Sequence, residues 1–428
     1  MPEKWKSNVS FVAAAIGSAV GLGNIWMFPY RVGIYGGASF LIPFLILLFP
    51  AGVIGLTIEW TLGRSQRGGP SKAFGKSGMP YGKYLGVFPL VAVFLLAGFY
   101  VVVFGWAIRY LLASFGNQMF SAPKEFFKLI ANSPQSYFFL FLAVALTALI
   151  VARGIRKGIE KSNLILMPLL FILLIVLAIR SLTLPGAAEG LEFYLKPDLS
   201  KLTPSAWLAA LSQVFLSLSL TGGIMVVYGS YLQPKEDIPC SSIAVSFGCA
   251  AVGITAGFII IPAIFAFGLE PTSGPRLIFI TLPHVFASMP AGRFFSFLFF
   301  LALIFAALTS TVSMLELEVN AICDYFKWTR KKATLLAGGL IFLIGAALAP
   351  NEEAFGFAVD LSTVYLALIG ALIAALALGW FFGAEKAEEE LNKGAIVGFG
   401  SWWKPMAKWV YPLIIGGILV MSILRIRG

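Results

Sequence analysis

The sequence predicts an all-α membrane protein with about eleven transmembrane helices, two of which are interrupted near their middle. Composition is the first reason, because 59% of the residues are hydrophobic and only 12% are charged, with a mean hydropathy of +0.89. Soluble globular domains carry about 25% charged residues. The second reason is a series of long apolar segments, and the third is a cluster of glycine, hydroxyl and amide groups inside two of them.

Each predicted span is long and apolar enough to cross a bilayer. The spans cover residues 9–32, 38–62, 84–114, 136–152, 163–181, 205–231, 240–268, 293–323, 333–349, 356–382 and 406–424. The first is too long for a cleavable signal, so we expect it to remain. Longer external connections are expected before Trp207 and from Glu270 to Gly292, and Lys386–Lys393 is typical of a short amphipathic connector.

Basic residues predict the orientation. The chain has 31 lysines and arginines against 20 acids, and most of the basic residues fall on the side of the N-terminus. Cytoplasmic loops carry such an excess, so we expect a plasma-membrane protein with its N-terminus inside and its C-terminus outside. The charge then faces anionic lipid and not nucleic acid. With one histidine, three scattered cysteines and no phosphate-binding loop, the sequence gives no reason to expect a cofactor, zinc or ATP.

The first interrupted span contains GSAVGLGNIWMFP at residues 17–29. Three glycines, Asn24 and Pro29 weaken a helix where a continuous one is otherwise needed. Unpaired backbone groups are costly in hydrocarbon, so a break is tolerated only where protein, water or a bound ion satisfies them. The break therefore predicts a binding site. The alternative is close helix packing through Gly17 and Gly21, whose spacing also suits that role.

The second interrupted span, Leu208–Leu232, carries Ser217, Ser219 and Thr221 before Gly222 and Gly223. A second break at a matching place favours a binding site over packing. Spans one to five and six to ten would form two inverted repeats that face each other at the bilayer midplane. The expected units are residues 1–182, an external connection at 183–203, residues 204–383, and a connector with span eleven at 384–428.

The chemistry of such breaks favours a cation next to a carboxylate. Half-helices present N–H groups to anions and carbonyls to cations. Sodium prefers oxygen ligands, and the breaks supply carbonyl, amide and hydroxyl oxygens without an evident acid. Adjacent Thr309 and Ser310 in span eight could complete an oxygen cage with the carbonyls of residues 17–20. The alternative is that both hydroxyls bond back to their own helix.

Several motifs resemble the sodium:neurotransmitter symporter family, in particular its prokaryotic amino-acid transporters such as the bacterial leucine transporter. The motifs are W-x-S-x(9)-G-S-A-V-G-L-G-N-I-W-x-F-P-Y at residues 5–30, I-E-W-x-L-G-R at 58–64, S-L-S-L at 217–220, F-I-T-L-P at 279–283 and A-x-L-T-S at 306–310. The similarity covers nearly the whole chain, although many members have twelve spans. It implies a leucine-transporter-like fold with spans 1 and 6 unwound at the midplane.

The resemblance implies two sodium sites. The first would consist of the carbonyls of Gly17, Val20 and Ala306 and the hydroxyls of Thr309 and Ser310. The second would use the Ala19 carbonyl, Asn24 and Ser217 beside the substrate carboxylate. Its remaining ligand position is Cys249, a poor ligand for a hard cation, with Ser246 one turn away as a partial substitute.

The substrate position is implied in the same way. Gly21 stands where monoamine carriers of the family have an aspartate, which implies an amino acid whose own carboxylate joins the site. The residues implied to contact the substrate are Ala19, Gly21, Gly23, Leu96, Tyr100, Leu216, Ser217, Ser219, Gly222 and Met314. Tyr100 would hold the carboxylate. Gly222 replaces a frequent aromatic residue, which suggests room for a large apolar or aromatic side chain.

The implied gates depart from the family pattern. The external gate pairs an arginine with an acid; here the acid is Asp360 but the arginine is Met27. The internal-gate acid is Asp324, and Lys4 or Lys6 would replace the missing arginine. Gly253 fills the position that relatives use for chloride or a replacing acid, so chloride dependence is not expected.

We expect a secondary active symporter, not an enzyme, that imports a neutral, hydrophobic or aromatic amino acid with Na⁺ by alternating access. Its partners would be the amino acid, sodium and the lipid bilayer. The alternatives are a proton-coupled or sodium-independent carrier of the same fold, and a channel or non-transporting amino-acid sensor. The sequence leaves open which amino acid binds and whether one or two sodium ions accompany it.

Overall fold

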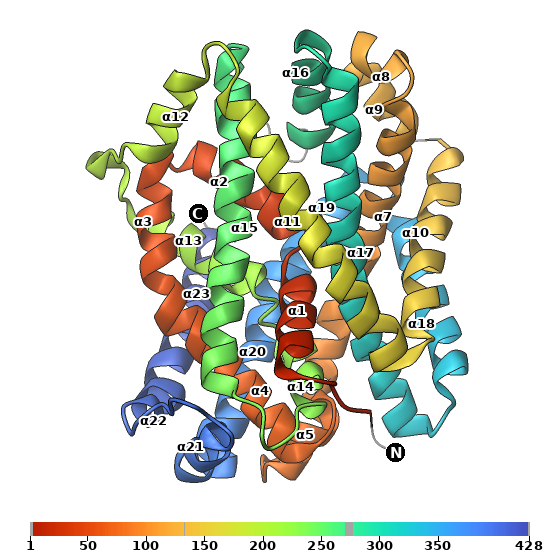
Figure 1. The fold of residues 1–428 in the computed structure, drawn as a ribbon. Coiled ribbons are helices and arrows are strands. Elements are labelled where there is room, and N and C mark those ends of the chain that lie inside the picture. Colours follow the sequence, from red (N-terminus) through yellow and green to blue (C-terminus); the bar gives the residue numbers. More distant parts are fainter. Residues whose placement is uncertain (1–2, 132, 270–276, 427–428) are drawn as a thin grey trace.

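The computed structural model describes residues 3–131, 133–269 and 277–426, and all regular structure in these ranges is helical (Figure 1). Within these ranges, eight helical runs are long and apolar enough to cross a membrane, and two bent pairs bring the number to ten. The interrupted pair α13 and α14 supplies the remaining predicted span. The predicted all-helical membrane fold is therefore confirmed. Part of the connection expected from Glu270 to Gly292 lies outside the described residues.

The helices follow one another along the chain with short connections. The first half contains α1 (Asn8–Ala19), η1 (Gly23–Met27), α2 (Phe28–Ile34), α3 (Ala38–Leu47), η2 (Leu48–Val53), α4 (Ile54–Gln66), α5 (Pro70–Lys76), α6 (Gly82–Leu85), α7 (Val87–Ala113), α8 (Gln118–Ser121), α9 (Pro123–Ala131), α10 (Gln135–Val151), η3 (Ile155–Glu160), α11 (Lys161–Leu182) and α12 (Ala187–Leu195). The second half contains η4 (Leu199–Lys201), α13 (Pro204–Ser217), α14 (Ile224–Ser230), α15 (Ile238–Ala266), η5 (Leu277–Thr281), α16 (Leu282–Ser288), α17 (Gly292–Phe326), α18 (Arg330–Leu348), α19 (Glu352–Asp360), η6 (Leu361–Leu366), α20 (Ala367–Leu376), η7 (Ala377–Gly383), α21 (Ala384–Asn392), α22 (Trp403–Pro405), η8 (Met406–Val410) and α23 (Tyr411–Ile426).

The long helices α7, α15 and α17 run through the height of the molecule, and the broken pair α1 and α2 lies among them (Figure 1). The N-terminal end of the chain lies at the same end of the molecule as α5, α21 and α22. The short helices α8, α12 and α16 lie at the opposite end. The first broken span therefore lies among continuous helices.

The first break separates α1 from η1 and α2. The side chain of Ser7 caps the start of α1 by accepting from the Ser10 N–H, and the helix ends at Ala19. Val20 then adopts an extended conformation, and the direction of the helix changes by 58° across the break. Of the residues predicted to interrupt this span, Gly21 lies in the gap and Gly23 and Asn24 lie in the π-helical turn that follows it, whereas Gly17 is still part of α1.

The second break separates α13 from α14. Ser219 and Gly222 both have positive φ, 52° and 69°, a conformation that stops a helix and that favours glycine. A Cβ on Gly222 would lie 2.0 Å from the Gly370 carbonyl oxygen of α20, and a Cβ on Gly370 would lie 2.1 Å from the Thr221 oxygen. The second break therefore needs glycine on both sides of its contact with α20.

Candidate functional site

The first break and helix α17 share a group of oxygen atoms. Ser310 Oγ lies 3.2 Å from the Val20 carbonyl oxygen and 3.2 Å from the Ser18 carbonyl oxygen of α1. Calcium, a cation of similar radius to sodium, binds oxygen at about 2.3–2.6 Å, and adjacent octahedral ligands at the short end of that range stand about 3.2 Å apart. The Ser310 hydroxyl and the Val20 carbonyl therefore have the spacing of two ligands of one cation.

Thr309 behaves differently from its neighbour. Its hydroxyl lies 3.1 Å from the Ala306 oxygen and 3.0 Å from the Phe305 oxygen of its own helix. This is the back-bonding that membrane helices commonly show, and it places Thr309 Oγ1 beside another predicted sodium ligand. Thr309, Ser310 and Ala306 are all buried. Gly17, one turn before Val20, lies against Asn163 of α11.

The predicted second sodium site also consists of buried oxygens. Asn24 is 1% exposed; its amide donates to the Cys249 carbonyl oxygen at 3.0 Å, and its Oδ1 has no hydrogen-bond partner among the described residues. Ser246 Oγ on α15 is likewise buried without a partner there. Ser217 Oγ accepts from the Gln213 amide at 2.9 Å. The contact of Cys249 with Asn24 is thus made by its backbone carbonyl, and ligation of a second ion at this position stays a prediction.

The predicted carboxylate position lies directly beside the first oxygen cluster. The Tyr100 hydroxyl of α7 faces the backbone N–H groups of Leu22 and Gly23, which begin a helix and have no acceptor within it. A Cβ on Gly21 would lie 3.0 Å from Tyr100 Oη and 2.5 Å from Ser310 Oγ. A single glycine therefore separates the Tyr100 hydroxyl and the free N–H groups from the oxygen cluster.

The other residues predicted to contact the substrate surround this position unevenly. Leu96 and Met314 are buried, Leu216 packs against Gly23, and Ser219 Oγ donates to the Ser18 carbonyl oxygen at 3.2 Å. Ala19 ends α1 and is also buried. The structure gives a different reason for Gly222 than room for the substrate, because its missing side chain makes way for α20. The contribution of Gly222 to the pocket stays a prediction.

Sequence reasoning found no acid at either break, but helix α4 brings one to the second. Glu59 is 1% exposed, and its carboxylate accepts the Gly222 N–H at 2.8 Å and faces the N–H groups of Val226 and Met225. It thus satisfies the Gly222 N–H, which the break leaves free, while its Oε2 has no hydrogen-bond partner among the described residues. An isolated acid in the apolar segment 38–62 was the available signal, but its target becomes visible only in three dimensions.

Replacing Glu59 by glutamine is expected to destabilise the folded protein. The amide keeps one acceptor but adds a donor that faces other donors, and leaving a buried group unsatisfied costs about 1–3 kcal/mol. Thermal unfolding of the purified protein in detergent measures the change. The matched control is Glu389→Gln on the exposed side of α21. Equal unfolding temperatures for Glu59→Gln and the unmodified protein would contradict this role.

Beyond the first break, a different arginine occupies the region of the predicted gate. Asp360 is exposed, and Met27 is partly buried. Arg31, one turn beyond Met27, donates to Gln213 Oε1 at 3.0 Å and to the Ala209 carbonyl oxygen at 3.1 Å. Gln213 in turn donates to the Gly23 carbonyl oxygen at 3.0 Å. This chain of bonds joins α2 to α13, whereas the role of Asp360 as a gate stays a prediction.

At the N-terminal end, the ion pairs differ from the predicted one. Asp324 lies 3.9 Å from Lys72 of α5. Near the N-terminus, Glu3 and not Lys4 forms an ion pair with α18, because its carboxylate lies 3.5 Å from Arg330. Arg330 also pairs with Glu316.

Aromatic side chains close the same end. The Tyr231 hydroxyl donates to Glu316 at 2.7 Å, and fully buried Trp5 donates to the Tyr228 carbonyl oxygen at 3.1 Å. The N-terminal segment is thus anchored to α14, α17 and α18. Any gating by Asp324 with Lys4 stays a prediction.

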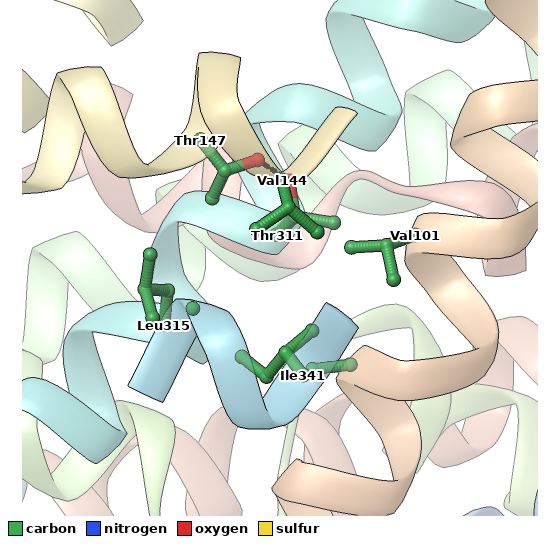
Figure 2. Close-up of a pocket in the computed structure, with 8 residues that line it drawn as sticks. Val101, Val144, Thr147, Thr311, Leu315 and Ile341 are labelled. Atoms are coloured by element: carbon green, nitrogen blue, oxygen red, sulfur yellow. Dashed lines mark hydrogen bonds between the residues drawn. The ribbon is translucent and has the colours of Figure 1, made fainter. Parts of the chain in front are cut away.

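A small cavity between α7, α10, α17 and α18 lies on another side of α17 (Figure 2). It is just large enough for one water molecule, and apolar atoms line it. The Thr147 and Thr311 hydroxyls at its edge bond to each other at 2.9 Å. The neighbouring hydroxyls of α17 therefore point in different directions, because Ser310 faces the first break while Thr311 faces α10.

Two broken helices that bring unpaired backbone groups together at a buried site are typical of secondary transporters. A family model described as the sodium:neurotransmitter symporter family matches residues 2–126 and 125–428. The chain belongs to this family, which consists of transporters and not enzymes, and the predicted resemblance is confirmed.

Individual relatives match along their full length. An uncharacterized sodium-dependent transporter of Haemophilus influenzae is 36% identical over 449 residues, covering 98% of each chain. The uncharacterized sodium-dependent transporter YhdH of Bacillus subtilis is 36% identical over 433 residues, covering 97% of this chain and 96% of its own. The crystal structure of MhsT in complex with L-phenylalanine matches with a TM-score of 0.89 and 38% identity, covering 98% of this chain and 99% of MhsT.

Proposed function

We propose that the protein is a sodium-coupled symporter that imports a neutral, hydrophobic or aromatic amino acid. The observation that carries this proposal is the position of Gly21 between Tyr100 Oη and Ser310 Oγ. A carboxylate held by Tyr100 and the N–H groups of Leu22 and Gly23 would lie next to a cation held by Ser310 and Val20. Each ligand would then neutralise the other at a buried site.

The walls of the site support the substrate class. Leu96, Leu216 and Met314 present apolar side chains. Position 21 carries no acid to bind the substrate's amine, and a side chain there would meet Ser310 and Tyr100. A zwitterionic amino acid with an apolar side chain fits these groups best. The relative MhsT, whose structure contains L-phenylalanine, supports the same class.

Coupling follows from shared contacts. Sodium and the amino acid each stabilise the arrangement of the first break that the other needs, so each raises the affinity for the other by the same factor. A second ion at Ala19, Asn24 and Ser217 would add to this effect, with the Asn24 and Ser246 oxygens as free ligands. Alternating access would come from rocking the broken spans with their neighbours against the remaining helices, with the N-terminus on the cytoplasmic side.

Uptake into liposomes tests the proposal. An inward sodium gradient is expected to drive accumulation of phenylalanine or leucine, and a pH gradient alone is expected to drive none. Lysine and glutamate serve as control substrates and should not compete. Uptake driven by the pH gradient would favour the proton-coupled alternative, and binding without counterflow exchange would identify a sensor.

A further inference from the structure

Helix α11 carries a buried asparagine that neither implied sodium site includes. Asn163 is 1% exposed, and its Nδ2 donates to the Ile159 carbonyl oxygen at 2.8 Å. This bond fixes the orientation of the amide, because the reversed orientation would point Oδ1 at another acceptor. Asn163 Oδ1 therefore faces away from α11, and it has no hydrogen-bond partner among the described residues.

The free oxygen points at α1, one turn before the first break. A Cβ on Gly17 would lie 1.8 Å from Asn163 Oδ1 and 2.9 Å from its Cγ, so the amide lies directly against the α1 backbone. The Gly17 N–H already belongs to the hydrogen-bond ladder of α1 and is not available as a donor. The carbonyl of this same Gly17 is an implied sodium ligand. Asn163 thus reaches the edge of the oxygen cluster from a third helix.

A buried acceptor without a donor needs a mobile partner, either water or a cation. On α1 itself, the residue after Gly17 carries another buried oxygen, Ser18 Oγ, which faces the Tyr228 hydroxyl. All three oxygens belong to neutral groups, which can bind sodium but hold it less strongly than a carboxylate would.

The position of Asn163 along α11 shows on which side of the oxygen cluster its amide lies. The helix α11 begins at Lys161, directly after η3, and η3 contacts the N-terminal segment through bonds from Ile155 N to Glu3 and from Lys6 N to Glu160. The amide is therefore on the side of the oxygen cluster that faces the N-terminal end. An ion that leaves the cluster toward this end meets Asn163 as it passes Gly17.

We propose that Asn163 Oδ1 is a transfer ligand that takes the partly hydrated sodium ion from the Gly17, Val20 and Ser310 cluster and passes it toward the N-terminal side of the protein. This inference rests on the proposed sodium coupling. It assigns Asn163 to release of the ion and not to its initial binding. The required glycine at position 17 follows from the same contact.

The experiment compares Asn163→Leu, which keeps the approximate shape, with Asn163→Asp, which keeps the oxygen and adds charge. The matched control is Ser162→Ala on the same turn of α11. Each protein is reconstituted in liposomes, and two rates are measured with labelled phenylalanine: net uptake under an inward sodium gradient, and exchange with equal sodium on both sides. Net uptake requires sodium release inside, whereas exchange does not.

We expect Asn163→Leu to lower net uptake roughly tenfold or more while exchange stays unchanged, since outer ligands typically affect metal sites ten- to a hundredfold. Asn163→Asp should also slow net uptake and should reach half-maximal exchange at a lower sodium concentration. An unchanged ratio of net uptake to exchange in both variants would overturn the proposal, as would an equal fall of both rates in Asn163→Leu. Absence of sodium-driven uptake in the unmodified protein would instead refute the proposed function itself.

Discussion

A protein that carries both Thr309→Ala and Ser310→Ala is expected to lose sodium-driven uptake while it still folds and inserts. Ser310 supplies the hydroxyl that reaches Val20 and Ser18 across the break, and Thr309 supplies the one beside Ala306. Each hydrogen bond or contact to a charged group contributes about 1.5–3 kcal/mol, so losing two predicts a fall of roughly a hundredfold or more. Uptake into liposomes over a range of sodium concentrations measures it.

The matched control for the double variant is Thr311→Ala. Thr311 lies on the same helix, but its hydroxyl pairs with Thr147 on the far side from the break. This variant should keep its sodium dependence. Sodium dependence that persists in the double variant would remove Thr309 and Ser310 from the proposed cation site.

Gly21→Ala is expected to abolish both substrate binding and sodium coupling. The new methyl group would lie 2.5 Å from Ser310 Oγ and 3.0 Å from Tyr100 Oη, so both groups must move. A displacement of about 1 Å in a binding constellation can cost roughly a hundredfold in rate. Uptake and equilibrium binding of labelled phenylalanine, measured on the same preparation, check the result.

Gly339→Ala provides the control, because a Cβ at Gly339 of α18 meets nothing within 4 Å. It should leave uptake and thermal unfolding unchanged. Normal binding of phenylalanine by Gly21→Ala would show that the carboxylate and the cation do not meet at Gly21.

The breaks themselves could be predicted from sequence because their cause is local. Glycine, proline and hydroxyl residues within an apolar segment weaken the helix wherever the segment lies, so Gly21, Asn24 and Ser219 mark the gaps without knowledge of the fold. The family motifs added the likeness to known transporters, which the comparisons confirmed. The roles assigned to individual residues of the site remain predictions, and the distances in the structure say which atoms each role would involve.

The groups that sequence reasoning missed act at long range. Glu59 reaches Gly222, 163 residues away along the chain, and Asn163 reaches Gly17 from another helix. Arg31 bonds to Gln213 across 182 residues. Which polar side chain meets which break depends on helix packing, and one sequence carries no direct signal of such pairs. The ion pairs of Asp324 with Lys72 and of Glu3 with Arg330 are of the same kind, whereas a gate formed by Asp324 with Lys4 or Lys6 stays a prediction.

The contact of the second break with α20 has a consequence for movement. Thr221 and Gly222 meet Gly370 through backbone atoms, with no side chain from either glycine in the contact. Interlocking side chains resist sliding because rotamers must change for one surface to pass another. A contact between peptide groups has no interlocking side chains, so it would let these two segments slide past each other without rotamer changes if the helices move.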